Sequence, residues 1–282
     1  MKLFTRAAVV ADALSLGAHW IYDQSQIASL FPEGVTAFAD PVSPYHPNRK
    51  AGELTHYGDQ CLMLQDSIAK RNGFALDGWR EDWLTGMANY DGYLDGATRE
   101  TQSTEGRTPS GSSDLAGAAR LAPILDFELS LEDAVDAARA QTALTHGDPS
   151  VADAAEFFVR ATASVIKGAA IDAAFSEALE SGRYEGIDVK ACLERAREAA
   201  QGNIAPMKVA SDFGLGCDVS GAFPLALYMA LLPDTTYASV ISTNALAGGD
   251  SSARGMLLAV LFAAREAEAG AALAGELKAK TE

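Results

Sequence analysis

Acidic and imidazole side chains interrupt an otherwise apolar segment near the start of the chain. Asp12, His19 and Asp23 are separated by seven and four residues, which is the spacing of side chains on one face of a helix. An unpaired buried carboxylate is costly, so this face needs either a partner in the core or a polar pocket. One interpretation is a satisfied core Asp–His hydrogen bond, and the other is a face that lines a ligand pocket.

A second segment with chemical potential is THYGDQC, residues 55–61. We expect Asp59 in the first turn of the apolar helix that follows, where free amides and the helix dipole favour an ionised carboxylate. Such a carboxylate can hold a metal or accept a sugar hydroxyl, or it simply caps the helix. His56 and Gln60 flank it and supply ring nitrogens and an amide.

The same pattern recurs at GGDSS, residues 248–252. The glycines, Gly249 among them, let the backbone turn tightly or approach a ligand. Asp250 or Ser251 is placed to cap the helix that follows. The free amides of such a helix start also suit a phosphate. A helix cap and a ligand site are therefore both open interpretations here.

Helices must position these segments, because apolar residues recur at spacings of three and four through most of the chain. Asp148-Pro149 and Ser130 add helix-start signals, and no run of β-branched residues alternates with polar ones. We predict an all-α fold with helices at 3–22, 59–71, 79–90, 114–125, 131–145, 150–169, 171–181, 188–201, 219–232, 235–247 and 251–269.

Three stretches break the helical pattern. Residues 31–56 contain four prolines, which predicts an ordered surface loop. Residues 98–113 are small and polar, as is typical of a flexible lid or site loop. Residues 270–282 are expected to be a frayed helix or tail. Since there is no internal repeat and no domain boundary, we predict one domain over residues 1–282.

The composition excludes several classes of protein. The 282 residues include 38 acidic and 22 basic side chains, for a formal charge of −16, which argues against a nucleic-acid partner. With 48% hydrophobic residues the chain is not disordered. It has no apolar stretch long enough for a membrane helix, and its three separated cysteines suit a reducing compartment. We expect a cytoplasmic protein without a membrane partner, and the sequence leaves the oligomeric state open.

Five short blocks follow one another in an informative order. They are ADAL at 11–14, YGDQC at 57–61, AARLAP at 118–123, THGDP at 145–149 and GGDSSA at 248–253. Together they resemble the ADP-ribosylglycohydrolase family, all-α hydrolases that remove ADP-ribose from proteins and small acceptors. The family's corresponding blocks are GDAL, YTDDT, AMRIAP, a TH helix start and GGDTDT. The resemblance implies a compact orthogonal multi-helix bundle over most of the chain.

The family's magnesium chemistry depends on carboxylates that this sequence largely lacks. The family holds two magnesium ions with TDD, DTDT and, in many members, a Glu that ends the first motif, and here only Asp59 and Asp250 remain. Magnesium requires near-octahedral oxygen ligands. We therefore expect no tightly bound magnesium pair and no other cofactor; if a metal binds at all, Asp59 and Asp250 are its ligands. The replaced positions are His19, Gly58, Gln60, Ser252 and Ala253.

These replacements are more typical of a different kind of site than of a random loss of metal ligands. HWIYD at 19–23 and THYGDQ at 55–60 are similar to motifs of a family branch that includes lens crystallins of the same fold. A histidine titrates near neutral pH and transfers protons. We expect neighbouring aspartates to orient His19 and to raise its pKa.

The leading hypothesis is a glycoside-cleaving hydrolase that acts on an ADP-ribosyl or small N-ribosyl compound without the paired metal. Cleavage at an anomeric carbon needs a carboxylate near that carbon and an acid or base at the leaving group. The expected catalytic residues are His19, Asp59 and Asp250. The expected substrate-binding residues are Asp12, Asp23, His56, Gln60, Gly249, Ser251 and Ser252.

Two alternatives come from other functional classes. A non-catalytic member of the fold, ligand-binding or structural in the manner of the crystallins, would also have lost metal ligands. The polar residues kept in the pocket blocks favour chemistry over this alternative. Magnesium-dependent hydrolysis of ADP-ribosyl-protein, as in the parent family, ranks below both because so many ligands are missing.

Overall fold

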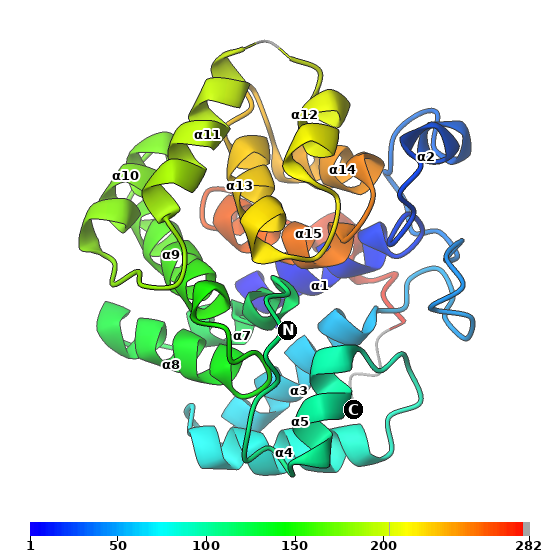
Figure 1. Ribbon diagram of the computed structural model, residues 1–282. Helices are drawn as coiled ribbons and strands as arrows, with labels where there is room; N and C mark the ends of the chain where they lie inside the picture. Colours follow the sequence, from blue (N-terminus) through cyan, green and yellow to red (C-terminus); the bar gives the residue numbers. More distant parts are fainter. Residues whose placement is uncertain (203, 279–282) are drawn as a thin grey trace.

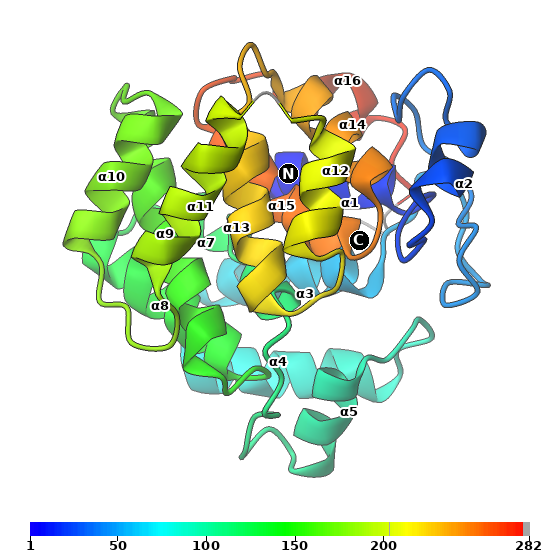
Figure 2. The ribbon, with the colours of Figure 1, turned by 45° about the horizontal axis from the view of Figure 1, so that its top comes forward.

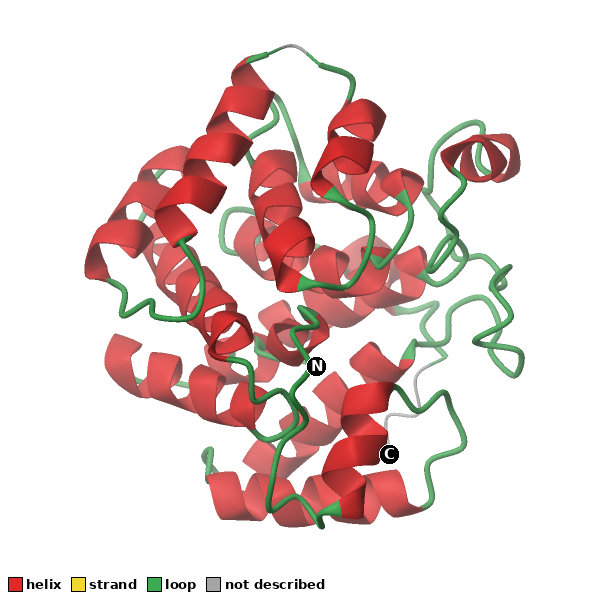
Figure 3. Ribbon diagram, in the orientation of Figure 1, coloured by secondary structure: helices red, strands yellow, loops and turns green. Residues whose placement is uncertain are grey.

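Most of the chain is helical in the computed structural model, which describes residues 1–202 and 204–278 (Figure 3). No strand forms in these residues, whose extended segments contribute only isolated β-bridges, Ser110 with His146 and Asp114 with Asp218. The predicted all-α fold is confirmed. No helix in the described residues combines the length and the hydropathy that crossing a bilayer requires.

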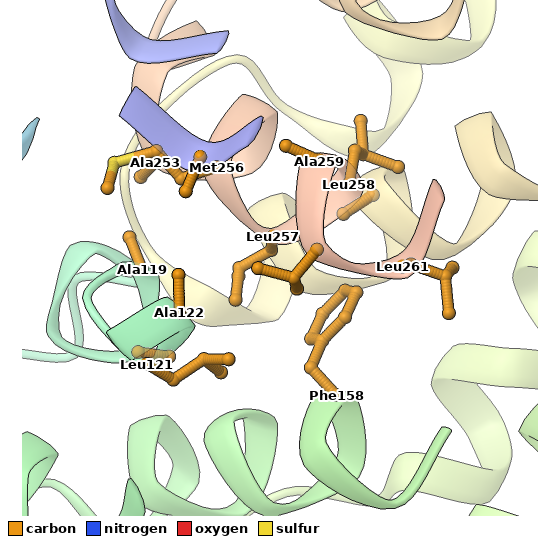
Figure 4. Close-up of a cluster of buried hydrophobic side chains, with 14 of the residues drawn as sticks. Ala119, Leu121, Ala122, Phe158, Ala253, Met256, Leu257, Leu258, Ala259 and Leu261 are labelled. Carbon is orange, nitrogen blue, oxygen red and sulfur yellow. The ribbon is translucent and has the colours of Figure 1, made fainter. Parts of the chain in front are cut away.

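Two apolar helices form the centre of the bundle. α1 (Leu3–Ser15) and α15 (Ser251–Ala263) pack side by side in the middle of the molecule (Figure 1). Every residue of α15 is buried, as expected for a helix without a polar face. Figure 4 shows side chains of α15, Leu257 among them, gathered in one cluster with Phe158 and Leu121 from neighbouring segments.

The remaining helices surround this central pair. Helices α10 to α14 lie on one side of it, and α3, α4 and α5 lie on the opposite side, in both views of the ribbon (Figure 2). Their bounds are α2 Gln24–Leu30, α3 His56–Arg71, α4 Leu76–Ala88, α5 Gly96–Ser103, α6 Ala116–Ala119, α7 Ala122–Leu125, α8 Leu131–Ala143, α9 Pro149–Ile166, α10 Ile171–Ser181, α11 Val189–Gln201, α12 Pro206–Phe213, α13 Val219–Ala230, α14 Tyr237–Ala247 and α16 Ala271–Ala274. Short helices α2, α5 and α12 lie in stretches where no helix was predicted.

Local sequence signals decide where several helices begin. Ser130 caps α8 and Asp148 caps α9, in each case by accepting a hydrogen bond from a backbone amide of the first turn. Pro149 occupies the first position of α9, as predicted. Thr55 caps α3, so Asp59 lies in the first turn of that helix without being its cap.

The first helix is shorter than predicted. α1 ends at Ser15, and residues 16–20 form tight turns where the helix was expected to continue. Trp20 has a φ of +60°, a left-handed conformation that a right-handed helix cannot include. Asp23 caps the separate helix α2. The prediction that Asp12, His19 and Asp23 share one helix face is therefore wrong, because His19 lies in the turn and Asp23 at the start of the next helix.

A helix also replaces part of the predicted loop at 98–113. α5 starts after Asp95, whose carboxylate accepts a hydrogen bond from the amide of Thr98 at 2.6 Å. The residues of α5 are small and polar, so the apolar spacing that indicates a helix is weak there, and the cap supplies the start signal. The prediction of an irregular segment is wrong for its first residues, 98–103.

The long proline-rich loop is confirmed, because residues 31–55 contain no helix. Near its end, the carbonyl of Gly52 accepts a hydrogen bond from the amide of Lys278 at 2.7 Å. The C-terminal segment after α16 therefore docks on this loop. Of the predicted tail, residues 279–282 lie outside the described part of the chain.

Candidate functional site

Asp12 joins the three segments that the sequence singled out. Its fully buried carboxylate accepts hydrogen bonds from the amide of Thr55 at 2.8 Å, from the Thr55 hydroxyl at 2.6 Å and from the Ser252 hydroxyl. These bonds tie α1 to the starts of α3 and α15. A Cβ at Gly58 would collide with this carboxylate, so glycine is required there.

The turn before α15 fixes the backbone around Asp250. Gly248 and Gly249 have φ values of +78° and +62°, which suit glycine. Gly249 exchanges two backbone hydrogen bonds with the segment around Trp20: it accepts from the Trp20 amide at 2.8 Å and donates to the Ile21 carbonyl at 2.7 Å. The 19–21 turn and the 248–250 turn therefore lie against each other.

Asp250 occupies the N-cap position of α15, yet its side chain makes no capping hydrogen bond. The carboxylate is fully buried, and neither oxygen has a hydrogen-bond partner among the described residues. Its Oδ1 lies 3.7 Å from Nδ1 of His19. Burial raises the pKa of Asp250 to about 6, against the opposing effect of the Arg254 guanidinium. The side chain of Asp250 therefore does not act as the cap of α15.

His19 is also fully buried, beside Asp250. Its Nδ1 accepts a hydrogen bond from the Ser252 amide at 3.4 Å, which places the proton of the neutral ring on Nε2. Burial lowers the pKa of His19 well below its usual value, and the charges of nearby groups, Arg254 among them, act in the same direction. The expectation that neighbouring aspartates raise this pKa is wrong, because desolvation of the buried ring is the largest effect on it.

A cluster of aromatic rings separates His19 from the surface. Trp20 stacks on His19 with ring centroids 4.4 Å apart and on His46 at 5.3 Å. The edges of Tyr45 and Tyr93 each meet Trp20 at 5.0 Å. The left-handed backbone of Trp20 costs about 1–2 kcal/mol, so the surrounding rings hold this residue in a strained position.

His56 is buried on the inner side of this cluster and faces α5. Its Nε2 lies 3.2 Å from Oδ2 of Asp95. Burial alone would raise the pKa of Asp95, but the contact with His56 and the hydrogen bond from Thr98 bring it below its usual range. Sequence reasoning missed Asp95, because no local signal links a residue before α5 to a histidine in α3.

Asp114 was missed as well. Burial raises its pKa well above the usual value, and the charge of Asp250 adds to that effect. Asp114 immediately precedes the short turn that leads into α6, and its backbone pairs with Asp218 in an isolated bridge. Asp114 is half-buried, so its carboxyl ionises with difficulty both because it is partly removed from water and because of the charge of Asp250.

Asp59 faces a different neighbourhood from Asp250. Its Oδ2 lies 2.5 Å from Nη2 of Arg49 and accepts a hydrogen bond from the Tyr90 hydroxyl at 2.6 Å. Burial raises the pKa of Asp59 to about 6, and Arg49 opposes the change. Asp59 lines a hollow of about 310 Å³ that also includes Tyr90 and Asp66. A guanidinium is thus the immediate partner of the carboxylate that was expected to contact a sugar or a metal.

The other predicted contact residues have internal partners. Gln60 is buried, and its carbonyl accepts hydrogen bonds from Trp83 Nε1 at 2.9 Å and from Arg120 Nη1 at 2.6 Å. Asp23 is exposed as the cap of α2. Ser251 is buried, and its hydroxyl has no partner within the described residues. Of these three residues, only Ser251, which follows Asp250 in the chain, has a buried polar atom without a hydrogen-bond partner among the described residues.

The donor set fits a pair of magnesium ions poorly. Asp12 already accepts three hydrogen bonds, and Asp59 is bound by Arg49. Across residues 1–202 and 204–278, no three His, Cys, Asp or Glu side chains are grouped as a metal site. Asp250 is the one carboxylate of the expected set that lacks a protein partner within those residues.

The fold and the site together define the class of this protein, which is an all-α bundle built around a buried acid–histidine pair. The chain belongs to the ADP-ribosylglycohydrolase family, whose sequence profile matches residues 6–270. Among solved structures it is similar to a protein described as an ADP-ribosylglycohydrolase-related protein complex, with a TM-score of 0.69 and 19% identity over 93% of this chain and 86% of that one. At that identity the likeness shows the fold alone. No curated protein matches the chain.

Proposed function

We propose that this chain is a glycoside hydrolase that cleaves the ribosyl bond of an ADP-ribosyl or small N-ribosyl compound. The observation that carries the proposal is the Asp250 carboxylate, which is fully buried without a hydrogen-bond partner among the described residues. Burying such a group is costly unless a ligand meets it. A pKa near 6 also suits a residue that exchanges protons around neutral pH.

In the proposed reaction, water attacks the anomeric carbon of the ribose. Asp250 accepts a proton from that water while the new C–O bond forms and the bond to the leaving group breaks. The proton then passes to the leaving group, so the products are a free ribosyl hydroxyl and a protonated leaving group. The ionised form of Asp250 is the active one, because only that form accepts the proton.

His19 acts in this proposal as a neutral hydrogen-bond donor. Its Nδ1 is occupied by the Ser252 amide, and its Nε2 is buried without a partner in the described chain. The low pKa keeps the ring neutral at physiological pH. Nε2–H is therefore available to a ribose hydroxyl or to the leaving atom.

Asp12 is a positioning residue in this scheme. No hydrogen bond joins it to His19 among the described residues, but its hydrogen bond from the Ser252 hydroxyl fixes the residue whose amide holds the His19 ring. The same carboxylate holds Thr55 at the start of α3. Asp12 therefore sets the distance between the histidine and the turn that carries Asp250.

We also propose that the reaction proceeds without a magnesium pair. The support is the occupation of the expected ligands: Arg49 binds Asp59, and three hydrogen bonds satisfy Asp12. Magnesium prefers several free, charged oxygens in near-octahedral geometry. Asp250 alone cannot supply them.

The test is to incubate the purified protein with a panel of ADP-ribosylated and N-ribosyl compounds, with magnesium and with EDTA. Turnover that persists in EDTA and is abolished in Asp250→Asn supports the proposal. Asp188→Asn is the matched control, because Asp188 is an exposed cap of α11 and asparagine caps equally well. Loss of turnover in EDTA contradicts the metal-free reaction, and equal turnover in Asp250→Asn contradicts the role of Asp250.

One observation favours a second candidate, a ligand-binding protein without catalysis. His19 and Asp250 have no exposed surface, and Trp20 lies between His19 and the outside. Repeated turnover needs this cover to open in every cycle, whereas a protein that only holds a ligand needs it to open once. Calorimetry with ADP-ribose on the wild type and on His19→Ala separates the two: tight binding that needs His19, without turnover of any compound in the panel, favours the second candidate.

A further inference from the structure

A hollow at the start of α1 lies apart from the buried pair of His19 and Asp250. It lies where α1, α3 and α7 pack on one another, and its volume is about 330 Å³. Its walls are the start of α1, the last turns of α3, and α7 with the turn that follows it. Between Thr5, which lines the hollow, and Asp12, which holds the inner site together, α1 advances by about 10 Å.

The hydroxyl of Thr5 is an unpaired polar group at this hollow. The side chain of Thr5 has no exposed surface, and its Oγ1 meets no hydrogen-bond partner among the described residues. A threonine inside a helix commonly returns its hydroxyl to the carbonyl one turn earlier. Because Thr5 makes no such bond, its hydroxyl remains available both as a donor and as an acceptor. A buried hydroxyl without a partner costs about 1–3 kcal/mol, which a ligand that hydrogen-bonds to it would offset.

The charged side chains of the hollow are already engaged within the protein. The Asp126 carboxylate accepts hydrogen bonds from the amides of Phe4 at 2.9 Å and Thr5 at 2.8 Å, so it caps the start of α1 from outside the helix. Lys2 Nζ donates a hydrogen bond to the Asp126 carbonyl at 2.9 Å. The side chains of Lys2 and Asp126 thus bring opposite charges to the same hollow. This balance favours an uncharged ligand over an ion of either sign.

Apolar side chains form most of the remaining lining, which consists of Met1, Ile68, Ala69, Pro123 and Phe127 together with the polar Gln65 and Asn72. Ile68 and Pro123 are buried and Phe127 is half-buried, so these side chains present an apolar wall below the surface. An apolar wall with one well-placed polar group is the usual composition of a site for a small molecule. The wall takes up a ring, and the polar group fixes its orientation.

We propose that this hollow binds a small uncharged phenol or ring alcohol, whose ring packs among the apolar side chains and whose hydroxyl hydrogen-bonds to Thr5. The proposal is independent of ribosyl hydrolysis, because His19, Asp12 and Asp250 do not line the hollow. Binding here can therefore fail while the proposed hydrolysis holds, and the reverse is equally possible.

The probe is phenol, compared with benzene, which lacks the hydroxyl, and with benzoate, which carries a charge. Binding is followed by NMR titration of the isotope-labelled protein, through the amide signals of Ala69 and Phe127, which line the hollow. We expect phenol to give saturable shifts at millimolar concentrations, as is usual for a ligand of so few atoms. Benzoate should bind more weakly than phenol, because the hollow offers no cation that is free of a protein partner.

Thr5→Val keeps the shape of the side chain and removes its hydroxyl. It should weaken phenol binding by about three- to tenfold, the effect of one hydrogen bond between uncharged groups, and leave benzene binding unchanged. Thr162→Val is the matched control, because the Thr162 hydroxyl is also buried without a partner in the described chain but does not line the hollow. Ala69→Trp, at an exposed position on the wall, should fill the hollow and abolish the shifts from both compounds.

Four results would each overturn the proposal. Phenol could give no saturable shifts at these amides, or benzoate could bind as tightly as phenol. Thr5→Val could leave the affinity for phenol unchanged, or weaken phenol and benzene alike, which would show that its hydroxyl is not the contact. Undiminished phenol binding by Ala69→Trp would place the ligand outside this hollow.

Discussion

Replacing Asp250 with asparagine should stabilise the protein and remove its activity. Burial raises the pKa of this carboxyl from 3.8 to about 6, so the folded state at neutral pH holds an ion that would be better hydrated in the unfolded chain. A change of this size corresponds to about 3 kcal/mol when the group is ionised. Because asparagine has the same shape and no charge, it should recover about 1–3 kcal/mol, the lower value allowing for a buried amide.

The sign of the pH dependence follows from the direction of the change. A raised pKa means that the folded state binds the proton more tightly, so the wild type loses stability as pH rises from 3.8 to about 6. The advantage of Asp250→Asn should therefore be small at low pH and complete above this window. It should be about 2 kcal/mol larger near pH 7.5 than near pH 4.5.

The assay is urea unfolding of the wild type and Asp250→Asn across this pH range, followed by circular dichroism. Asp188→Asn, at an exposed cap of α11, should show no comparable pH-dependent difference. A variant that is less stable than the wild type at neutral pH refutes the reasoning, because it would show that the Asp250 carboxylate is satisfied in the folded protein. A gain in stability that does not depend on pH would show that the ionisation of Asp250 is not its cause.

Three further substitutions test other parts of the site. Trp20→Ala should raise the rate at which diethyl pyrocarbonate modifies His19 at least about tenfold, because a buried ring reacts only through transient opening. The modification is measured by mass spectrometry, and an unchanged rate means that Trp20 does not cover His19. Arg49→Gln should lower the free energy of unfolding by about 1–3 kcal/mol by leaving Asp59 unpaired, and a double-mutant cycle with Asp59→Asn should recover most of this loss; additive effects exclude the coupling. Gln60→Leu should cost about 2–4 kcal/mol, because two buried donors lose their acceptor, and a change in KM without loss of stability contradicts this structural role.

Much of the fold could be predicted from the sequence, because its signals are local. The helices capped by Ser130 and Asp148 combine a start signal with apolar residues at helical spacing, and both begin as predicted. The end of α1 could not be predicted in this way. Apart from His19, residues 16–20 remain apolar, and the turn that follows α1 closes with the left-handed backbone of Trp20, whose amide donates a hydrogen bond to the distant Gly249.

The candidate site was predictable only in part. The structure brings His19 to Asp250 and Asp12 to Ser252, so the segments that the motifs singled out do meet, although the helical spacing of Asp12, His19 and Asp23 was not what brings them together. Asp59 faces elsewhere because its partner, Arg49, belongs to a loop that carries no local structural signal. The direction in which the pKa of His19 shifts could not be predicted from the sequence either, because it depends on how completely the ring is desolvated.

The pH dependence of hydrolysis in the presence of EDTA tests the central claim most directly. With a ribosyl compound that the wild type cleaves, kcat/KM should rise with pH through about 6, because ionised Asp250 accepts the proton of the attacking water. Asp250→Asn should lose this rise together with the activity, and Asp188→Asn should retain both. A rate in EDTA that does not respond to pH in this range, or that survives in Asp250→Asn, would contradict the account.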